Sequence, residues 1–285
     1  MAPMTAAAAP VTLCGSLSRH PVALGMTMHR AGYEALGLPF TYVPFAVDDV
    51  RGALVGMRAL GIRGFGVSMP FKLDVIPLLD RLDELAQRIG AVNTIVNESG
   101  VLVGYNTDAW GAARALEETM PILGRRIMVL GGGGAARAVA FSLAAEGASV
   151  HVVNRTADKA ARIAAEISGA TAGGLDDLRQ LSDFDAVVNC SSVGMVEYGR
   201  ASPVPEEELR AGLVVMDIVY KPLKTELLEL AEQRGARTVH GGRMLLYQAC
   251  RQFELYTGCP APRVAMNAAL EAAIGGNLFR DVAAP

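Results

Sequence analysis

One glycine-rich segment has the residues and the spacing to bind a pyrophosphate. The segment Gly131–Ala136 follows an apolar run that predicts a strand, and it precedes a stretch with helical spacing. Its pattern is G-x-G-x-x-A, in which glycines allow a tight turn and the first helical turn offers N–H groups to phosphate. A flexible turn is the alternative for such a motif by itself, but strand, loop, helix and next strand follow at βαβ spacing. The candidate cofactor-binding residues are Gly131, Gly133, Gly134, Ala135 and Ala136.

The end of the next predicted strand indicates which dinucleotide binds. A site selective for NAD usually has Asp or Glu about 20 residues after the glycines, where it binds the ribose hydroxyls. This chain has Asn154, Arg155 and Thr156 there, with Lys159 one helical turn later. The tripeptide holds no carboxylate to repel a 2′-phosphate, and the guanidinium of Arg155 matches phosphate geometry. We predict NADP over NAD; a solvated helix start is the alternative for Arg155 and Lys159.

Three polar segments in the first part of the chain lie at predicted strand or helix junctions. They are Ser68–Lys72, Gly90–Thr94 and Gly104–Asp108. Ligands bind at such junctions in open α/β sheets, outside the carboxyl ends of the strands. We predict that Lys72 lies at the head of a helix, just past a strand.

With these motifs the chain resembles the shikimate dehydrogenase family. The resemblance runs from about residue 11 to 275 and rests on P-F-K, G-A-V-N-T, N-T-D, the glycine loop and N-R-T. Later matches lie at Asp217–Pro222 and Met244–Ala249. The resemblance implies an NADP-dependent alcohol dehydrogenase that interconverts shikimate and 3-dehydroshikimate in the shikimate pathway of aromatic amino acid biosynthesis. It also implies a cleft between a substrate domain and an inserted NADP domain.

The resemblance assigns Lys72 and Asp108 as the catalytic pair. Lys72 would exchange the proton of the reacting hydroxyl, and Asp108 would orient the lysine and the ring. The chemistry agrees, because hydride transfer from an alcohol needs a base within hydrogen-bond reach. From the residues alone, Lys72 could be a surface lysine and Asp108 a helix cap or first-turn acid.

The resemblance also assigns four residues that bind the substrate. Asn93 and Gln248 would hydrogen-bond ring hydroxyls, Ser68 would replace a family threonine, and Tyr220 would point at the substrate carboxylate. Without the resemblance, Asn93 would be a turn residue, Tyr220 a core aromatic and Gln248 a helix surface amide.

The sequence departs from the family where the substrate carboxylate is bound. The family has Ser-x-Ser-Pro just before a histidine that matches His29, and the aligned segment here is Ala23–Met26. Each lost hydrogen bond to a charged group removes about 1.5 to 3 kcal/mol, so losing two weakens binding about 100-fold or more. The departure therefore favours an altered substrate. An alternative is that the longer preceding loop binds the carboxylate through Ser16, Ser18, Arg19 or His20.

Other features of this region leave further alternatives. The loop Gly15–Pro21 contains its own Ser-Leu-Ser, which a second alignment would place on the family serines. Gly66 stands where the family usually has asparagine, which also indicates a changed substrate. For His29, a structural role is the alternative to ligand contact.

Composition and charge exclude several classes of partner. The chain has 285 residues, with 26 Lys and Arg against 29 Asp and Glu, so no net field would attract a nucleic acid. Its four cysteines have no zinc spacing, so we expect neither a metal nor a disulfide framework. No apolar run is long enough to cross a membrane and no secretory signal is evident, so we expect a cytoplasmic protein.

The order of elements predicts an α/β fold with two domains. We predict helices at 27–36, 49–60 and 107–118, with Asp48 or Asp49 as a cap and Gly37 and Gly61 at C-terminal ends. The predicted domains are residues 1–105 with 244–285, an open α/β substrate domain, and residues 106–243, a Rossmann-type dinucleotide-binding domain. The predicted strands are 11–14, 41–45, 64–68, 94–97, 101–105, 127–130, 149–154, 186–189, 214–218 and 238–240.

The sequence leaves alternatives for substrate and assembly. The expected partner is a small cyclic hydroxy acid, namely shikimate, quinate, an amino analogue or a less acidic polyol. A non-catalytic NADP-binding sensor and a folate-linked dehydrogenase are the competing functions. A homodimer is one open assembly.

Overall fold

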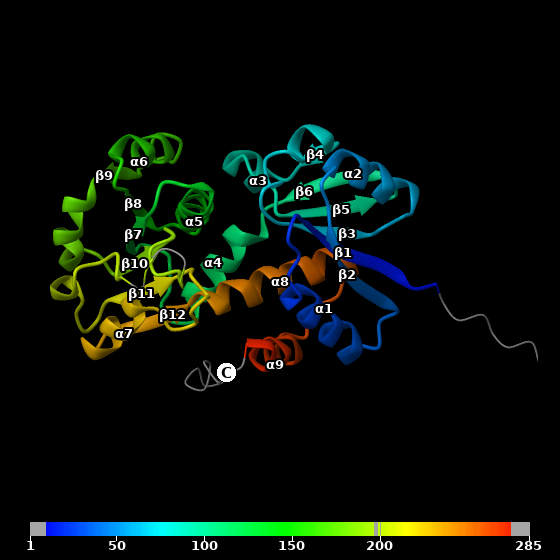
Figure 1. The fold of residues 1–285 in the computed structure, drawn as a ribbon. Coiled ribbons are helices and arrows are strands. Elements are labelled where there is room, and N and C mark those ends of the chain that lie inside the picture. Colours follow the sequence, from blue (N-terminus) through cyan, green and yellow to red (C-terminus); the bar gives the residue numbers. More distant parts are fainter. Residues whose placement is uncertain (1–9, 197–198, 200, 275–285) are drawn as a thin grey trace, which may run out of the picture. The chain divides into compact units, whose positions relative to one another are not determined.

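The computed structural model describes residues 10–196, 199 and 201–274, which divide into two compact units (Figure 1). The first unit contains residues 10–83, 92–105 and 252–274, and the second contains residues 84–91 and the described part of 106–251. Each unit has one six-stranded sheet with helices packed on it. The predicted α/β fold class is confirmed.

The sheet of the first unit is mixed, with the strand order β2-β1-β3-β5-β6-β4. β1 pairs in parallel with β2 and β3, whereas β5 is antiparallel to β3 and β6. The carboxyl ends of β1 and β3 therefore lie at one edge, where the Ser68–Lys72 segment begins. β4 is a two-residue edge strand that the sequence did not predict. The strands are β1 (Thr12–Ser18), β2 (Phe40–Ala46), β3 (Gly64–Val67), β4 (Arg81–Leu82), β5 (Thr94–Glu98) and β6 (Val101–Tyr105).

β1 continues to Ser18, beyond the predicted end at residue 14. Residues 14–17 pair with β2 on one side and with β3 on the other, so ladder hydrogen bonds hold this stretch in the sheet. Gly15 permits the close approach, because a Cβ there would lie 2.2 Å from the carbonyl oxygen of Val43. The prediction of a loop from Gly15 is therefore wrong for its first half, and Ser16 and Ser18 belong to a strand.

Three helices lie entirely within the first unit: α1 (Leu24–Ala35), α2 (Val50–Ala59) and α9 (Arg263–Ile274). The side chain of Asp49 caps α2 by accepting a hydrogen bond from the Gly52 N–H at 2.9 Å, which confirms one predicted cap. α1 begins at Leu24 rather than at the predicted residue 27. α9 packs against α1 in the first unit (Figure 1).

The sheet of the second unit is parallel throughout, in the order β12-β11-β10-β7-β8-β9. When β7 is counted as strand 1, the order is 3-2-1-4-5-6, as in dinucleotide-binding sheets. The strand order reverses between strands 1 and 4. β9 is a short edge strand that the sequence did not predict. The strands are β7 (Arg126–Leu130), β8 (Ser149–Val153), β9 (Thr171–Gly173), β10 (Ala186–Asn189), β11 (Val214–Asp217) and β12 (Arg237–His240).

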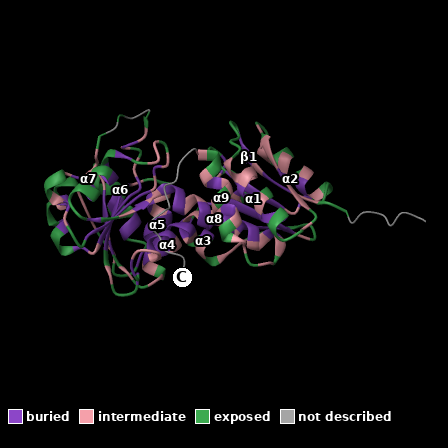
Figure 2. Cartoon of the chain, turned by 90° about the horizontal axis from the view of Figure 1, so that it is seen from below, coloured by how far each residue is buried: buried purple, intermediate pink, exposed green. Residues whose placement is uncertain are grey.

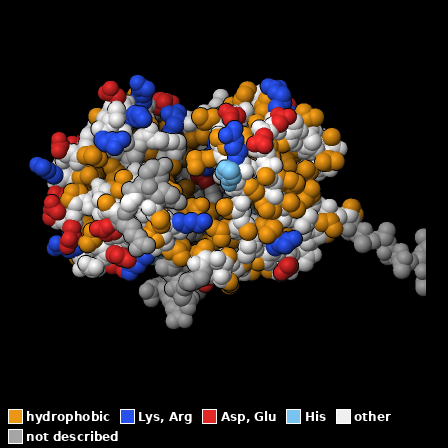
Figure 3. All heavy atoms as spheres, viewed as in Figure 1, with side chains coloured by type: hydrophobic (Ala, Val, Ile, Leu, Met, Phe, Trp, Pro, Cys, Tyr) orange, Lys and Arg blue, Asp and Glu red, His pale blue; other side chains and the backbone are white. Residues whose placement is uncertain are grey.

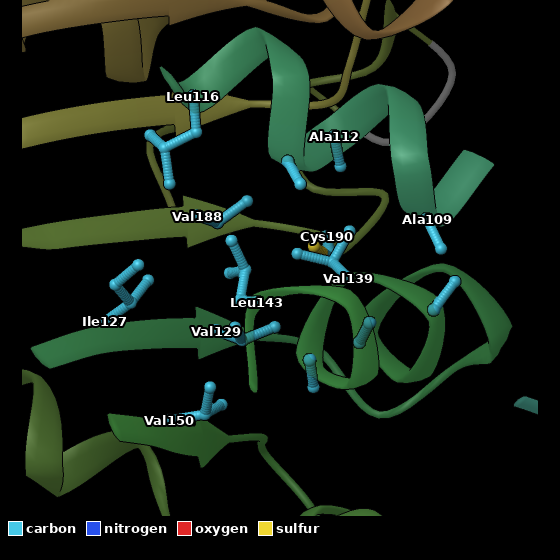
Figure 4. Packing of buried hydrophobic residues seen from close by; sticks show 14 of the residues in the cluster. Ala109, Ala112, Leu116, Ile127, Val129, Val139, Leu143, Val150, Val188 and Cys190 are labelled. Carbon is cyan, nitrogen blue, oxygen red and sulfur yellow. The ribbon is translucent and has the colours of Figure 1, made fainter. Parts of the chain in front are cut away.

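One hydrophobic core cluster of the second unit lies between this sheet and two helices, and a second cluster includes residues of α7. Side chains of β7, β8 and β10 pack against α4 and α5, as Figure 4 shows for Val129, Val150, Val188, Val139 and Leu116. Figure 2 shows the sheet and helices α4 and α5 largely buried, whereas α6 and α7 expose much of their surface. The remaining helices are α3 (Glu84–Ile89), α4 (Thr107–Glu117), α5 (Gly134–Ala145), α6 (Ala157–Ala164), α7 (Glu226–Gln233) and α8 (Gly241–Thr257).

Within the second unit, α4 and the first part of α8 pack with their backbones close together. A Cβ added at Gly111 would lie 2.8 Å from the Gln248 nitrogen and 2.8 Å from the Met244 oxygen, both backbone atoms of α8. Because backbone cannot rotate away as a side chain can, only glycine fits at this crossing. The crossing fixes the position of α4 relative to Gln248.

The surface gives no sign of a single-sign charge patch on the face shown in Figure 3, where basic and acidic side chains are interspersed. Within residues 10–196, 199 and 201–274, no helix is long and apolar enough to span a membrane.

Gly111→Ala should destabilise the protein by about 1–3 kcal/mol, because the new methyl group has to displace the α8 backbone. Urea unfolding followed by circular dichroism measures the change. Gly56→Ala in α2 is the matched control, since a Cβ there meets nothing within 4 Å. It should stabilise by about 0.5–1 kcal/mol through helix propensity. Equal effects of the two substitutions would contradict the close crossing of α4 and α8.

Candidate active site

The glycine-rich loop of the second unit joins β7 to α5 and fits a pyrophosphate. Gly131 has a φ of 143°, and a Cβ there would lie 3.1 Å from the carbonyl group of Cys190. A Cβ added at Gly133 or Gly134 would instead meet nothing within 4 Å, so the loop is open on that side. No side chain caps α5, whose N-cap residue is Gly133, so its first-turn N–H groups are available to an anion.

The segment after β8 lies beside this loop. A Cβ on Gly132 would lie 2.9 Å from the Asn154 side chain and 2.9 Å from the Lys159 Cβ. Arg155, Thr156 and Lys159 are all exposed, and the Asn154 amide donates a hydrogen bond to the Thr156 carbonyl at 3.0 Å. The structure therefore brings Asn154 and Lys159 to the glycine loop, and Arg155 directly follows Asn154 in the chain.

In the first unit, the backbone of Val92 and Asn93 joins the polar segments. The Val92 N–H donates to the Lys72 carbonyl at 2.9 Å, and the Val67 N–H at the end of β3 donates to the Asn93 carbonyl at 2.7 Å. Ser68 directly follows Val67. These bonds bring the backbones of Ser68, Lys72 and Asn93 to the same edge of the sheet.

Lys72 lies in a series of turns, so the prediction that it heads a helix is wrong. Pro70 and Pro77 bracket the segment, and proline lacks the N–H that a regular helix needs at interior positions. Only a 3₁₀ turn, Ile76–Leu78, follows. Lys72 is half-buried and Ser68 is exposed.

Asn93 is buried in the first unit with three polar neighbours that form a chain of hydrogen bonds. The chain links Asn93 to Thr94, Thr94 to Gln252 in α8, and Gln252 to His29 in α1. Sequence patterns did not single out Thr94 or Gln252. The available signal was a second glutamine one helical turn after Gln248.

Asp108 and Gln248 lie on α4 and α8 in the second unit. Asp108 is in the first turn of α4, whose N-cap Asn106 accepts a hydrogen bond from the Ala109 N–H at 3.1 Å. Because Asn106 supplies the cap, the interpretation of Asp108 as the capping residue is wrong. Asp108 and Gln248 are both half-buried, and the helices that carry them cross at Gly111.

Tyr220 lies just beyond β11 in a loop that a buried carboxylate orders. Asp217 accepts hydrogen bonds from the Val219 N–H at 3.0 Å, the Asn189 amide at 3.0 Å and the Thr225 hydroxyl at 2.7 Å. Burial raises the pKa of Asp217 to about 6, although these three hydrogen bonds act in the opposite direction. The sequence matched Asp217 to a family motif but gave it no role.

The segment Ala23–Met26, which lacks the family's Ser-x-Ser-Pro, lies at the start of α1. Ala23 is the N-cap residue and makes no side-chain cap hydrogen bond, and Gly25 lies in the first turn. Arg19 and His20 are exposed in the short link after β1, whereas Ser18 is buried. The four alternative ligands therefore do not belong to one loop.

Metal and thiol chemistry find no support in the part of the chain that the structure describes. There, no group of three or more His, Cys, Asp or Glu side chains could hold a metal ion. All four cysteines are free, and burial raises the pKa of Cys14 to about 12.

The second unit, with its strand order, uncapped helix and open glycines, is that of a dinucleotide-binding protein of the Rossmann class. The first unit adds a lysine and amides at the edge of a separate sheet. Residues 20–95 match the shikimate dehydrogenase substrate binding domain, 113–220 the shikimate / quinate 5-dehydrogenase model, and 241–271 the shikimate 5′-dehydrogenase C-terminal domain. The chain belongs to the shikimate dehydrogenase family.

Individual relatives agree with this membership. Shikimate dehydrogenase (NADP(+)) of Halorubrum lacusprofundi is 46% identical over 259 residues, which cover 87% of this chain and 94% of the relative. A crystal structure of shikimate dehydrogenase in complex with NADP+ is 38% identical, has a TM-score of 0.87, and covers 93% of this chain and 96% of its own. The ligand-free 5-ketofructose reductase of Gluconobacter sp. strain CHM43 is 32% identical, with a TM-score of 0.85 and coverage of 92% and 99%.

Asp217→Asn should change the pH dependence of stability. The folded state binds a proton at Asp217 more tightly than the unfolded chain, where the pKa is near 3.8, so wild-type stability falls as pH rises from about 4 to about 6. The unfolding free energy of the variant minus that of the wild type should therefore be larger at pH 7 than at pH 4, by about 2–3 kcal/mol. Urea titrations at both pH values measure it, and parallel pH profiles would contradict the raised pKa.

Proposed function

We propose that this chain is an NADP-dependent oxidoreductase that interconverts the ring hydroxyl and ketone of shikimate, or of a shikimate-like cyclic hydroxy acid. The reaction is shikimate + NADP = 3-dehydroshikimate + NADPH. The observation that carries the proposal is the family match over most of the chain. Two of the relatives named above are a shikimate dehydrogenase (NADP(+)) and a shikimate dehydrogenase in complex with NADP+, which supports the same cofactor here.

The proposed chemistry divides between proton and hydride. The cofactor held by the glycine loop would supply the redox chemistry, with NADP as the hydride acceptor in one direction and NADPH as the hydride donor in the other. Lys72 removes the proton from the hydroxyl oxygen as the carbonyl forms, and it returns that proton in the reverse direction. Asp108 orients the Lys72 side chain and the ring. The hydrogen bond from the Val92 N–H to the Lys72 carbonyl supports the role of Lys72, because it fixes the backbone of Lys72 beside Asn93.

The other assignments concern binding. Asn93 and Gln248 bind ring hydroxyls, Ser68 replaces the family threonine, and Tyr220 points at the carboxylate. The glycine loop binds the pyrophosphate, and Asn154, Arg155, Thr156 and Lys159 bind the 2′-phosphate end of NADP. The predicted substrate domain, residues 1–105 with 244–285, and the predicted NADP domain, residues 106–243, stay part of the proposal, although the two compact units divide the chain differently at residues 84–91 and 244–251.

A second candidate substrate is a less acidic cyclic polyol or ketone. It is favoured by Ala23 and Gly25, which offer no hydroxyl where the family binds the carboxylate, and by the buried position of Ser18. A solved relative named 5-ketofructose reductase, whose substrate name denotes a neutral sugar, supports it. A homodimer and a cytoplasmic location stay predictions from the sequence.

Reduction of NADP by the purified protein tests the function, with shikimate, quinate and a neutral cyclic polyol as substrates. Lys72→Ala should lower kcat by about 10²- to 10⁴-fold, the contribution of a positioned acid–base group. Lys224→Ala is the control, because that lysine pairs with Glu232 on the second unit's surface. Turnover of shikimate would support the main proposal, and a preference for the neutral polyol would support the second candidate. Tight NADP binding without any turnover would contradict both and favour a sensor.

Arg155→Ala should weaken NADP binding by about 10- to 100-fold, because one charged hydrogen-bonding partner of the 2′-phosphate is lost. NAD binding should stay unchanged, as NAD lacks that phosphate. Calorimetric titration of both dinucleotides measures the two affinities. Arg162→Ala is the matched control, because Arg162 is an exposed arginine too and lies on α6. Tighter binding of NAD than of NADP by the wild type would overturn the assignment.

A further inference from the structure

We propose that Gln252 is a positioning residue of the substrate site: through Thr94, its side-chain amide fixes which way the amide of Asn93 faces the substrate. The proposal rests on the function proposed above, in which Asn93 binds a ring oxygen. It deepens that function by assigning a direction to the hydrogen bond between Asn93 and the substrate.

The geometry is a chain of four buried polar side chains in the first unit. The Thr94 hydroxyl donates to Asn93 Oδ1 at 2.9 Å, and Gln252 Nε2 donates to Thr94 Oγ1 at 2.9 Å. At the other end, His29 Nε2 lies 3.4 Å from Gln252 Oε1. Their side chains come from α1, β5, α8 and the residue before β5. All four are buried, with Gln252 at 8% and Asn93 at 3% exposed.

One backbone carbonyl sets the orientation of the Gln252 amide. Gln252 Nε2 also lies 3.4 Å from the Asn93 carbonyl oxygen, which can only accept, so the nitrogen of this amide must face Asn93 and Thr94. Thr94 Oγ1 accepts from Gln252 Nε2, and in the structure the Thr94 hydroxyl donates to Asn93 Oδ1. Since Gln252 Oε1 faces His29, the histidine must donate from Nε2.

The state of His29 is consistent with that direction. Burial lowers the pKa of His29 to about 4, which the hydrogen bond to Gln252 only partly opposes, so the ring is neutral near pH 7. Its Nδ1 is buried without a hydrogen-bond partner, as expected for the nitrogen without a hydrogen. The ring stacks on Tyr42 at a centroid distance of 4.4 Å, which holds its plane.

Gly66 makes room for the Gln252 amide. A Cβ at Gly66 would lie 3.2 Å from Gln252 Nε2 and 3.1 Å from the Tyr42 hydroxyl, tighter than ordinary contact. At this position the family usually has asparagine. In this chain the amide beside β3 is instead supplied by α8.

The consequence for the substrate concerns donors and acceptors. Because Asn93 Oδ1 accepts the Thr94 hydrogen, the substrate meets the Nδ2 side of the amide, which only donates. Asn93 is thereby set to recognise an oxygen that accepts, either a ring hydroxyl lone pair or the ketone. Without the bond from Thr94 the amide can turn over and present its oxygen.

Steady-state kinetics of Gln252→Leu and Thr94→Val test the proposal with the substrate that the wild type turns over best. Each should raise KM about threefold to tenfold, the effect of one hydrogen bond, and leave kcat within about twofold. Because both act through the same bond, the double variant should be no worse than Thr94→Val. Thr94→Ser, which keeps the hydroxyl, should recover most of the affinity lost in Thr94→Val.

Tyr256→Phe is the control for a merely structural effect, since it removes a buried hydroxyl that lies outside the chain of four. Its KM should match the wild type. Unchanged KM in both test variants, additive effects in the double variant, or an equal KM change in Tyr256→Phe would overturn the role of Gln252. Absence of any turnover by the wild type would instead contradict the proposed function.

A second measurement reads the bond direction in the wild-type protein without turnover. Two-dimensional ¹H–¹⁵N spectra of histidine-labelled protein should show His29 as the Nε2–H tautomer, with no titration between pH 5 and pH 8. The groups packed around the ring are Gln252, Tyr33, Tyr42, Phe253 and Tyr256, none of which carries a charge in that range. An Nδ1–H tautomer would reverse the Gln252 amide and overturn the proposal.

Discussion

The candidate site of the first unit depends on the backbone of two consecutive residues, Val92 and Asn93. The Val92 N–H holds the turn that carries Lys72, the Asn93 N–H bonds to the Tyr105 carbonyl at 3.1 Å, and the Asn93 carbonyl accepts from the end of β3. Each bond lies in a buried part of the sheet, where an unpaired peptide group costs free energy. The same backbone hydrogen bonds therefore set the register of β3, β5 and β6 and the positions of the polar residues.

In the second unit, the buried carboxylate of Asp217 has a similar effect on its surroundings. Asp217 is fully buried at the end of β11, yet three donors converge on its carboxylate and one of them is the backbone of the loop that leads to Tyr220. A carboxylate without these donors would be costly at that depth. These hydrogen bonds therefore hold the proposed binding loop against the ends of β10 and β11.

Local patterns in the sequence predicted most elements and the residues at strand ends, because apolar runs and glycine positions record burial and turns. They failed where tertiary pairing decides. β4 and β9 are too short to show a period, and Gly15–Leu17 is paired on both sides although the Gly15–Ser18 segment has turn-like composition. The predicted helix at Lys72 is wrong because Pro70 and Pro77 limit the segment to turns. The link between His29, Thr94 and Gln252 joins distant parts of the chain, so no local pattern could reveal it.

The packing of Gln252 above Gly66 also constrains how the sequence can change over generations. An asparagine at position 66 would press against an amide already in place, so that substitution is unfavourable while Gln252 remains. Shortening residue 252 first would open the space and make the same asparagine acceptable. The two positions are therefore epistatic, and the order of substitutions decides whether a lineage can pass between an amide borne by the strand and one borne by the helix.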